Sequence, residues 1–98
     1  MGTGVDMDSR EALLKEYTAR YRRRITQGLA TYGEFDPATD KRNMCREAQE
    51  EALDIGSYME MLEQKRPDLK TKTRRILAKA VVLYGMLKKL EQEEGGGE

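Results

Sequence analysis

The sequence has no histidine, no tryptophan and only one cysteine, Cys45, in 98 residues. A single cysteine cannot form a disulfide within the chain, and without histidine a structural zinc site is effectively excluded. Any metal site must therefore use oxygen ligands, which favours a hard cation such as Mg²⁺ or Mn²⁺. A chain without disulfides fits a reducing compartment, so we expect a cytoplasmic protein.

Long apolar runs are also missing. Residues 1–8 lack the apolar core of a signal peptide, and no run of about 18 apolar residues is present to span a bilayer, so we expect no membrane partner. The 18 Lys and Arg residues balance 18 Asp and Glu residues, so no overall field draws the chain to nucleic acid. The P-loop motif, the nucleophile elbow and any Cys/His pair are absent, which argues against P-loop and covalent catalysis.

The length and apolar content of the chain limit the size of its core. A chain of 98 residues is expected to form a single helical domain over residues 1–98. Its residues are 38% hydrophobic and 37% charged, which is enough for a thin core but leaves long helices poorly covered. We therefore expect a homo-oligomer.

Apolar residues recur at intervals of three and four in three segments, which predicts an all-α fold. The three helices are expected in an antiparallel up-down arrangement within an oligomeric bundle. Their expected ranges are about 9–32, 38–65 and 69–93, with flexible termini at 1–7 and 94–98.

Capping residues mark the ends of these helices. Asp8 is a plausible cap for the first helix, and Gly33 supplies its stop. Either Asp36, which precedes a proline, or Asp40 caps the second helix. That helix is expected to end before Pro67, because the residue before a proline disfavours helical geometry.

Each helix carries an apolar stripe, which we interpret as packing surface for the fold and for subunit contacts. The third stripe steps by four and three residues and so forms a heptad seam that requires a partner helix. The first stripe comprises Leu14, Tyr17, Tyr21, Ile25, Leu29 and Tyr32. The second comprises Met44, Ala48, Ala52, Ile55, Met59 and Leu62. The heptad seam comprises Ile76, Ala80, Leu83, Leu87 and Leu90.

Four carboxylates share one face of the second expected helix, and we call them the acidic block. At about 100° per residue, their spacing places them beside the apolar stripe, at the border of the core. Like charges at this spacing repel by about 0.2–0.5 kcal/mol per pair, and only Arg46 compensates within the helix. The excess charge indicates a bound cation or arginines from another helix, and we favour the cation over both these arginines and a solvated face. The block comprises Glu47, Glu50, Glu51 and Asp54.

At the acidic block the sequence resembles the MazG-like all-α nucleotide pyrophosphohydrolases, particularly the short phage-type members. The resemblance covers about residues 32–62 and depends on the motif E-x-x-E-E-x-x-D from Glu47 to Asp54, followed by Tyr58. The segments at 32–35 and 41–44 also look similar. The family implies antiparallel helices in dimers or tetramers, with Mg²⁺ held by an ExxE pair from one helix and an ExxD pair from the next.

The sequence departs from this family pattern in its first helix. That helix lacks an EExxE element, because Glu11 and Glu16 are five residues apart and do not share a face. Only Glu47 and Glu50, on the same helix as the ExxD pair, stand in for it. Three alternatives remain open: a reduced single-helix site, a site completed across a subunit interface, and a member that has lost catalysis.

The resemblance implies hydrolysis of a nucleoside triphosphate to a monophosphate and pyrophosphate, with Mg²⁺ or Mn²⁺ bound by the acidic block. Glu50 is the candidate for orienting the attacking water. Tyr58 and Lys65 lie on the same side of the helix and are candidates for binding base or phosphate, although packing and solvation are their ordinary roles. Arg24 is a third candidate, whereas Arg20 is expected to pair with Glu16 four residues earlier.

Two other functions compete with this one. Basic residues crowd the start of the third helix, where they oppose the helix dipole and call for a partner anion, as in a nucleic-acid-binding regulator. The heptad seam favours instead a protein-interaction adaptor without catalysis. We rank the regulator below the enzyme, because the chain has little aromatic surface, no helix-turn-helix turn and zero net charge. The adaptor stays open as a third hypothesis. The basic cluster comprises Lys70, Lys72, Arg74 and Arg75.

Overall fold

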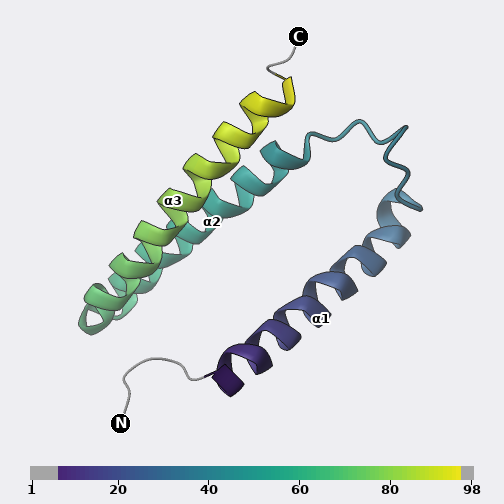
Figure 1. The fold of residues 1–98 in the computed structure, drawn as a ribbon. Helices are drawn as coiled ribbons and strands as arrows, with labels where there is room; N and C mark the ends of the chain where they lie inside the picture. The colour runs from purple at the N-terminus through teal and green to yellow at the C-terminus, as the bar shows by residue number, and fades with distance from the viewer. Residues whose placement is uncertain (1–6, 96–98) are drawn as a thin grey trace. The chain divides into compact units, whose positions relative to one another are not determined.

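The computed structural model describes residues 7–95, and within this range the chain is helical with no strand (Figure 1). The helices are α1 (Met7–Tyr32), α2 (Met44–Lys65) and α3 (Lys70–Gly95), and a short 3₁₀ turn, η1 (Pro67–Leu69), precedes α3. The prediction of an all-α fold with three helices is therefore confirmed. Residues 1–6 and 96–98, most of the expected flexible termini, lie outside the described residues, as does the Tyr32 side chain.

The two ends of α1 differ in how well they were predicted. Asp8 is not the cap, because α1 already begins at Met7, and it lies in the first turn, where its charge is favourable to the helix dipole. Gly33 ends α1 as predicted: its φ is +78°, and its N–H donates to the Leu29 carbonyl at 3.0 Å. Glycine adopts this left-handed conformation without the cost that a side chain would impose.

The start of α2 lies six residues later than expected, so the prediction of helix from residue 38 was wrong. Asp36 instead organises a turn, in which its carbonyl accepts from the N–H groups of Thr39 and Asp40 at 3.1 and 2.9 Å. The cap of α2 is Asn43, and neither Asp36 nor Asp40 takes that place. The Asn43 side chain accepts from the Arg46 N–H at 2.9 Å, which satisfies one free donor of the first turn.

The connection between α2 and α3 follows the proline. α2 ends at Lys65, as predicted, and the N–H of Arg66 donates to the Leu62 carbonyl at 2.8 Å. Pro67 then opens the 3₁₀ turn, because its missing N–H is not needed at a first helical position. α3 continues to Gly95, so Glu94, expected in a flexible terminus, is helical.

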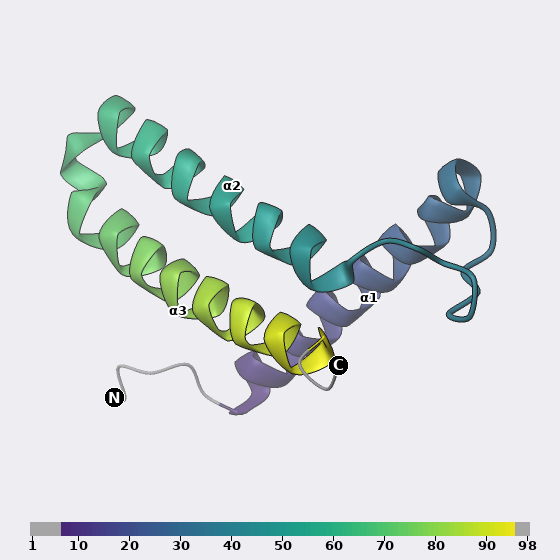
Figure 2. The same ribbon diagram turned by 90° about the horizontal axis from the view of Figure 1, so that it is seen from above.

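The chain divides into two compact units, Met1–Asp40 and Lys41–Glu98. In the second unit, α2 and α3 lie side by side as a helical hairpin, joined at one end by η1 (Figure 2). The start of α2 lies beside the end of α3, because Gln49 of α2 bonds to Glu91 of α3. At the closed end, Glu63 bonds to Arg74.

The hairpin is held by small side chains. Its buried apolar residues are Cys45, Ala52 and Ala80, and small residues of this kind let two helix backbones approach closely. The residues of α3 that are buried or half-buried step by four and three, as in a heptad. They are Thr73, Leu77, Ala80, Tyr84, Leu87 and Glu91.

This contact face is rotated from the predicted heptad seam, with which it shares only Ala80 and Leu87. Ile76, Leu83 and Leu90 are 46%, 44% and 49% exposed, so α2 is not the partner helix that the seam was predicted to require at these three positions. Polar Thr73 and Glu91 take part in the contact because each has a hydrogen-bond partner on α2. The contact with α2 is therefore centred about 60° around α3 from the heptad seam.

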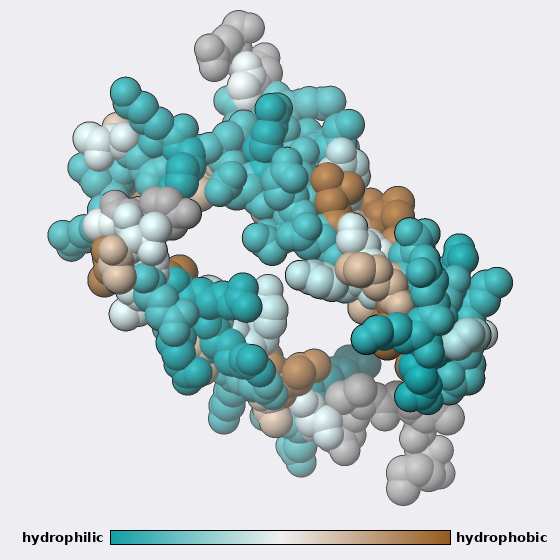
Figure 3. Space-filling model, turned by 180° about the vertical axis from the view of Figure 1, so that it is seen from behind, coloured by the Kyte–Doolittle hydropathy of each residue, from teal (hydrophilic) through white to brown (hydrophobic). Residues whose placement is uncertain are grey.

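Large apolar side chains of α1 lie on the surface. Leu14, Tyr17 and Ile25 of its stripe are 64%, 65% and 61% exposed, and the Tyr17 and Tyr21 rings meet edge to face at 5.5 Å between centroids. Figure 3 shows one face of the molecule, on which brown apolar residues interrupt the teal surface at several places. Within residues 7–95, no helix combines the length and apolar character needed to cross a bilayer.

Candidate functional site

The acidic block lies on the outer face of α2. Its four members are exposed, whereas Cys45, Gln49 and Ala52 are buried against α3. At about 100° per residue, the centre of the block is about 180° around the helix from these three residues. The prediction that the block borders the core was therefore wrong: the block points away from α3.

The orientation of α2 follows from polar contacts that the apolar stripe did not reveal. Gln49 and Cys45 face α3, because each donates to a glutamate of that helix. Ala48 and Ile55 of the stripe are consequently only half-buried, and Met44 is 43% exposed. With this rotation the carboxylates of the block are exposed to solvent.

No ion pair or hydrogen bond among residues 7–95 engages a carboxylate of the acidic block. Arg46, expected to compensate Glu50 within the helix, instead donates from Nη2 to Glu91 at 2.8 Å. Two glutamates outside the block, Glu63 and Glu91, do have arginine partners. The repulsion within the block is thus left uncompensated by the rest of the hairpin.

The donor set of the block suits a hard cation, since carboxylate oxygens are the preferred ligands of Mg²⁺. Its geometry is incomplete, because no three Asp, Glu or Cys residues in the described part of the chain are placed to hold one ion together. Side chains along one helix project in different directions around its axis, and Mg²⁺ commonly completes its shell with water and phosphate. Further protein ligands would have to come from another helix.

The structure places the three candidate substrate-binding residues on two helices. Tyr58 is 63% exposed and follows the block on the same outer face of α2, and Lys65 is exposed at the end of that face. Arg24 is exposed on α1, in the other unit, where it lines a shallow hollow with Tyr17 and Tyr21. Tyr58 and Lys65 therefore share a surface with the acidic block.

Two arginines outside this surface have carboxylate partners. Arg20 pairs with Glu16 at 3.3 Å, which confirms the expected contact between residues four apart. Arg74, from the basic cluster at the start of α3, donates to both carboxylate oxygens of Glu63 at 2.8 and 3.1 Å. For Arg74, a partner anion of the kind expected for this cluster is thus supplied by α2.

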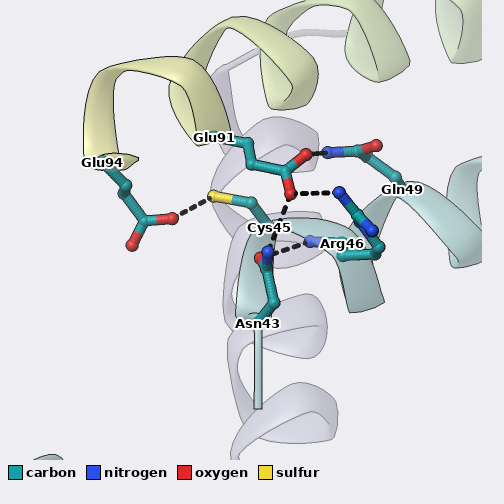
Figure 4. A network of polar contacts seen from close by, with 6 residues as sticks. All are labelled: Asn43, Cys45, Arg46, Gln49, Glu91 and Glu94. Atoms are coloured by element: carbon teal, nitrogen blue, oxygen red, sulfur yellow. Dashed lines mark hydrogen bonds and ion pairs between the residues drawn. The ribbon is translucent and has the colours of Figure 1, made fainter. Parts of the chain in front are cut away.

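Sequence reasoning did not find the polar network at the open end of the hairpin, where Glu91 is the central acceptor (Figure 4). Its Oε1 accepts from Gln49 Nε2 at 2.8 Å, and its Oε2 accepts from Asn43 Nδ2 at 2.7 Å. Arg46 Nη2 supplies the third donor. These hydrogen bonds, led by those from Gln49 and Asn43, lower the pKa of Glu91 below its ordinary value. Because the Glu91 carboxylate accepts three hydrogen bonds, we assign it a structural role: it joins the start of α2 to the end of α3.

Cys45 belongs to the same network. Its Sγ donates to Glu94 Oε1 at 2.9 Å (Figure 4). The hydrogen bond to Glu94, with burial and the nearby negative charges, raises the pKa of Cys45 to about 11. The protonated thiol is therefore the stable form, and it is a poor nucleophile at neutral pH.

A signal for this network exists in the sequence, in the spacing of its polar residues. Gln49 is a polar residue four after Cys45 and three before Ala52, and Glu91 follows Leu87 by four. Polar residues in register with two facing stripes can pair across a hairpin.

No family model, curated protein or solved structure matches this chain.

Proposed function

We propose that the chain is a cytoplasmic, metal-dependent nucleoside triphosphate pyrophosphohydrolase that releases a nucleoside monophosphate and pyrophosphate. One observation carries the proposal: the acidic block is exposed and without a basic partner on the hairpin, although α2 and α3 pair other glutamates with arginines. Four uncompensated carboxylates on one helix face favour binding of a divalent cation. The resemblance of this segment to the MazG-like family supports the same function.

In this proposal each candidate residue has a role. The acidic block, Glu47, Glu50, Glu51 and Asp54, holds Mg²⁺ or Mn²⁺, which supplies charge neutralisation for the phosphates. Glu50 orients the water that attacks a phosphorus atom of the substrate. Tyr58 and Lys65 bind base or phosphate from the same face of α2, and Arg24 binds phosphate from α1.

Assembly of the chain is part of the proposal. We expect the three helices to pack in an antiparallel up-down bundle that associates as a homodimer or homotetramer. The exposed stripe of α1 supports this expectation, because a helix gains most of its stability from burying its apolar face. An adjacent helix would also bring the additional ligands that the acidic block needs.

The decisive experiment is an assay of pyrophosphate release. The wild-type chain is incubated with deoxynucleoside and ribonucleoside triphosphates, with and without Mg²⁺ or Mn²⁺, beside Glu50→Gln and Asp54→Asn. We expect metal-dependent release that both substitutions reduce at least 100-fold, because each removes a charge from the block.

A matched control is Glu60→Gln, which removes an exposed carboxylate of α2 outside the acidic block and should leave turnover unchanged. Circular dichroism should give the same helix content for all variants, since the substituted side chains are exposed. Absence of turnover with every nucleotide, and no thermal stabilisation by either metal, would contradict the proposal.

The exposed apolar side chains favour a second candidate, a protein-interaction regulator without catalysis. The nucleic-acid variant of this candidate is less supported, because Arg74 of the basic cluster is already paired with Glu63. Binding of DNA or RNA that weakens steeply with salt would identify the nucleic-acid variant, whereas metal-dependent turnover would exclude both.

A further inference from the structure

α3 carries a second apolar stripe beside the face that contacts α2. The stripe consists of Ile76, Leu83 and Leu90, spaced by seven residues, and each is close to half exposed. A spacing of seven keeps side chains on one line along a helix and matches a partner helix with the same spacing. The α1 stripe instead advances by steps of four from Tyr17 to Leu29, so its line winds around the helix.

The first ten residues of α3 carry positive charge, and a segment near its end carries negative charge. Residues 70–79 contain five basic and no acidic residues, whereas residues 91–94 contain three acidic and no basic residues. Lys88 and Lys89 lie more than about 100° around the helix from the stripe. Lys72, Lys79 and Glu93 border the stripe, are exposed, and make no ion pair within residues 7–95.

We propose that α3 packs along its Ile76, Leu83 and Leu90 stripe against the same stripe of a second copy, with the two helices antiparallel. Antiparallel pairing about Leu83 sets the basic start of each α3 beside the acidic end of the other. Parallel pairing would set like charges together, which is unfavourable. The charge pattern therefore selects the antiparallel orientation.

This interface specifies how the copies associate, and its test does not depend on nucleotide hydrolysis. Ile76 and Leu90 are each seven residues from Leu83, so in an antiparallel pair Ile76 of one copy faces Leu90 of the other. We therefore expect a two-fold axis close to Leu83. Lys72 of one copy then lies near Glu93 of the other, while the two copies of Lys72 are about 33 Å apart along the helix axis at 1.5 Å rise per residue. Crosslinking distinguishes these distances.

The test uses single cysteines in a Cys45→Ser background and a short bismaleimide. Leu83→Cys should crosslink with itself. Lys72→Cys and Glu93→Cys should each fail alone but crosslink when the two variants are mixed and allowed to exchange. Self-crosslinking of Lys72→Cys would show parallel helices and overturn the proposal, as would failure of Leu83→Cys to crosslink.

A second measurement, sedimentation of the otherwise wild-type chain, guards against a variant that merely misfolds. Leu83→Glu should weaken self-association at least tenfold, with helix content unchanged by circular dichroism. The matched control is Val81→Glu, because Val81 is also an exposed apolar residue of α3 and lies about 160° around the helix from Leu83. Dissociation by Val81→Glu but not by Leu83→Glu would place the interface on the other side and overturn the proposal.

Reversal of charge tests the orientation separately. Lys72→Glu and Glu93→Lys should each weaken self-association several-fold, because each places like charges across the antiparallel pair. The double variant should restore it. A double variant weaker than both single variants would contradict antiparallel pairing.

Discussion

Gln49 of α2 and Glu91 of α3 face each other across the hairpin, with 2.8 Å between Nε2 and Oε1. Gln49 is one of two buried polar residues among those described, and its amide directs the buried side of α2. This contact fixes the rotation of α2 and, with it, the outward direction of the acidic block. The network around Glu91 thus positions the candidate site without belonging to it.

Acid should loosen the hairpin through Glu91. Its pKa is lowered in the fold by donors from Gln49, Asn43 and Arg46, so it contributes stability above its ordinary pKa of 4.5 that is lost as pH falls through the lower folded value. Glu63, whose pKa Arg74 lowers, acts in the same direction. Thermal melts followed by circular dichroism should therefore give a constant Tm near neutrality and a falling Tm below about pH 4.5.

The Glu91→Gln variant tests this assignment. It should melt at a lower temperature than the wild type at pH 7, and the difference should shrink as the pH is lowered, because protonated Glu91 is also neutral. Glu60→Gln, at an exposed position without a hydrogen bond, should behave like the wild type. A difference between Glu91→Gln and the wild type that stays constant with pH would contradict the prediction.

Cys45 should react slowly with alkylating reagents. A pKa raised from an ordinary 9.0 to about 11 reduces the thiolate fraction at pH 8 about 100-fold, and only the thiolate is reactive. Iodoacetamide labelling followed by mass spectrometry should give a rate that rises steeply above pH 9.

Removal of the partner charge gives the corresponding control. Glu94→Gln should lower the pKa of Cys45 and speed labelling at pH 8, while helix content is retained. Equal labelling rates for the wild type and Glu94→Gln would exclude the hydrogen bond to Glu94 as the cause of the raised pKa.

Two glycines should respond to alanine with opposite sign. A Cβ on Gly56 would meet only the Leu77 Cδ1 atom at 3.4 Å, an ordinary contact, so Gly56→Ala should stabilise the chain by about 0.5–1 kcal/mol through helix propensity. Gly33→Ala should destabilise it by about 1 kcal/mol, since φ there is +78°. Urea unfolding measures both, and a destabilising Gly56→Ala would indicate closer packing of α2 and α3 at this point.

The sequence predicted local structure more reliably than the direction of each helix face. Gly33 and Pro67 end their helices because their effects on the backbone are local. Asp36 was misplaced as a possible cap, because the same side chain stabilises either a helix start or a turn. For the candidate site, the helical spacing correctly grouped the acidic block on one face of α2. The prediction that this face borders the core was wrong.

The sequence by itself determined the helical periodicity, the absence of nitrogen ligands from histidine, and the grouping of four carboxylates along α2. Only the tertiary structure decided which side of each helix is buried, which acids have basic partners and which apolar stripes remain on the surface. The physical reason is that spacing along a helix fixes which residues share a face, whereas contacts with a neighbouring helix fix where that face points. Here Gln49, Cys45 and Glu91 outweighed the apolar stripe, since buried polar groups require partners.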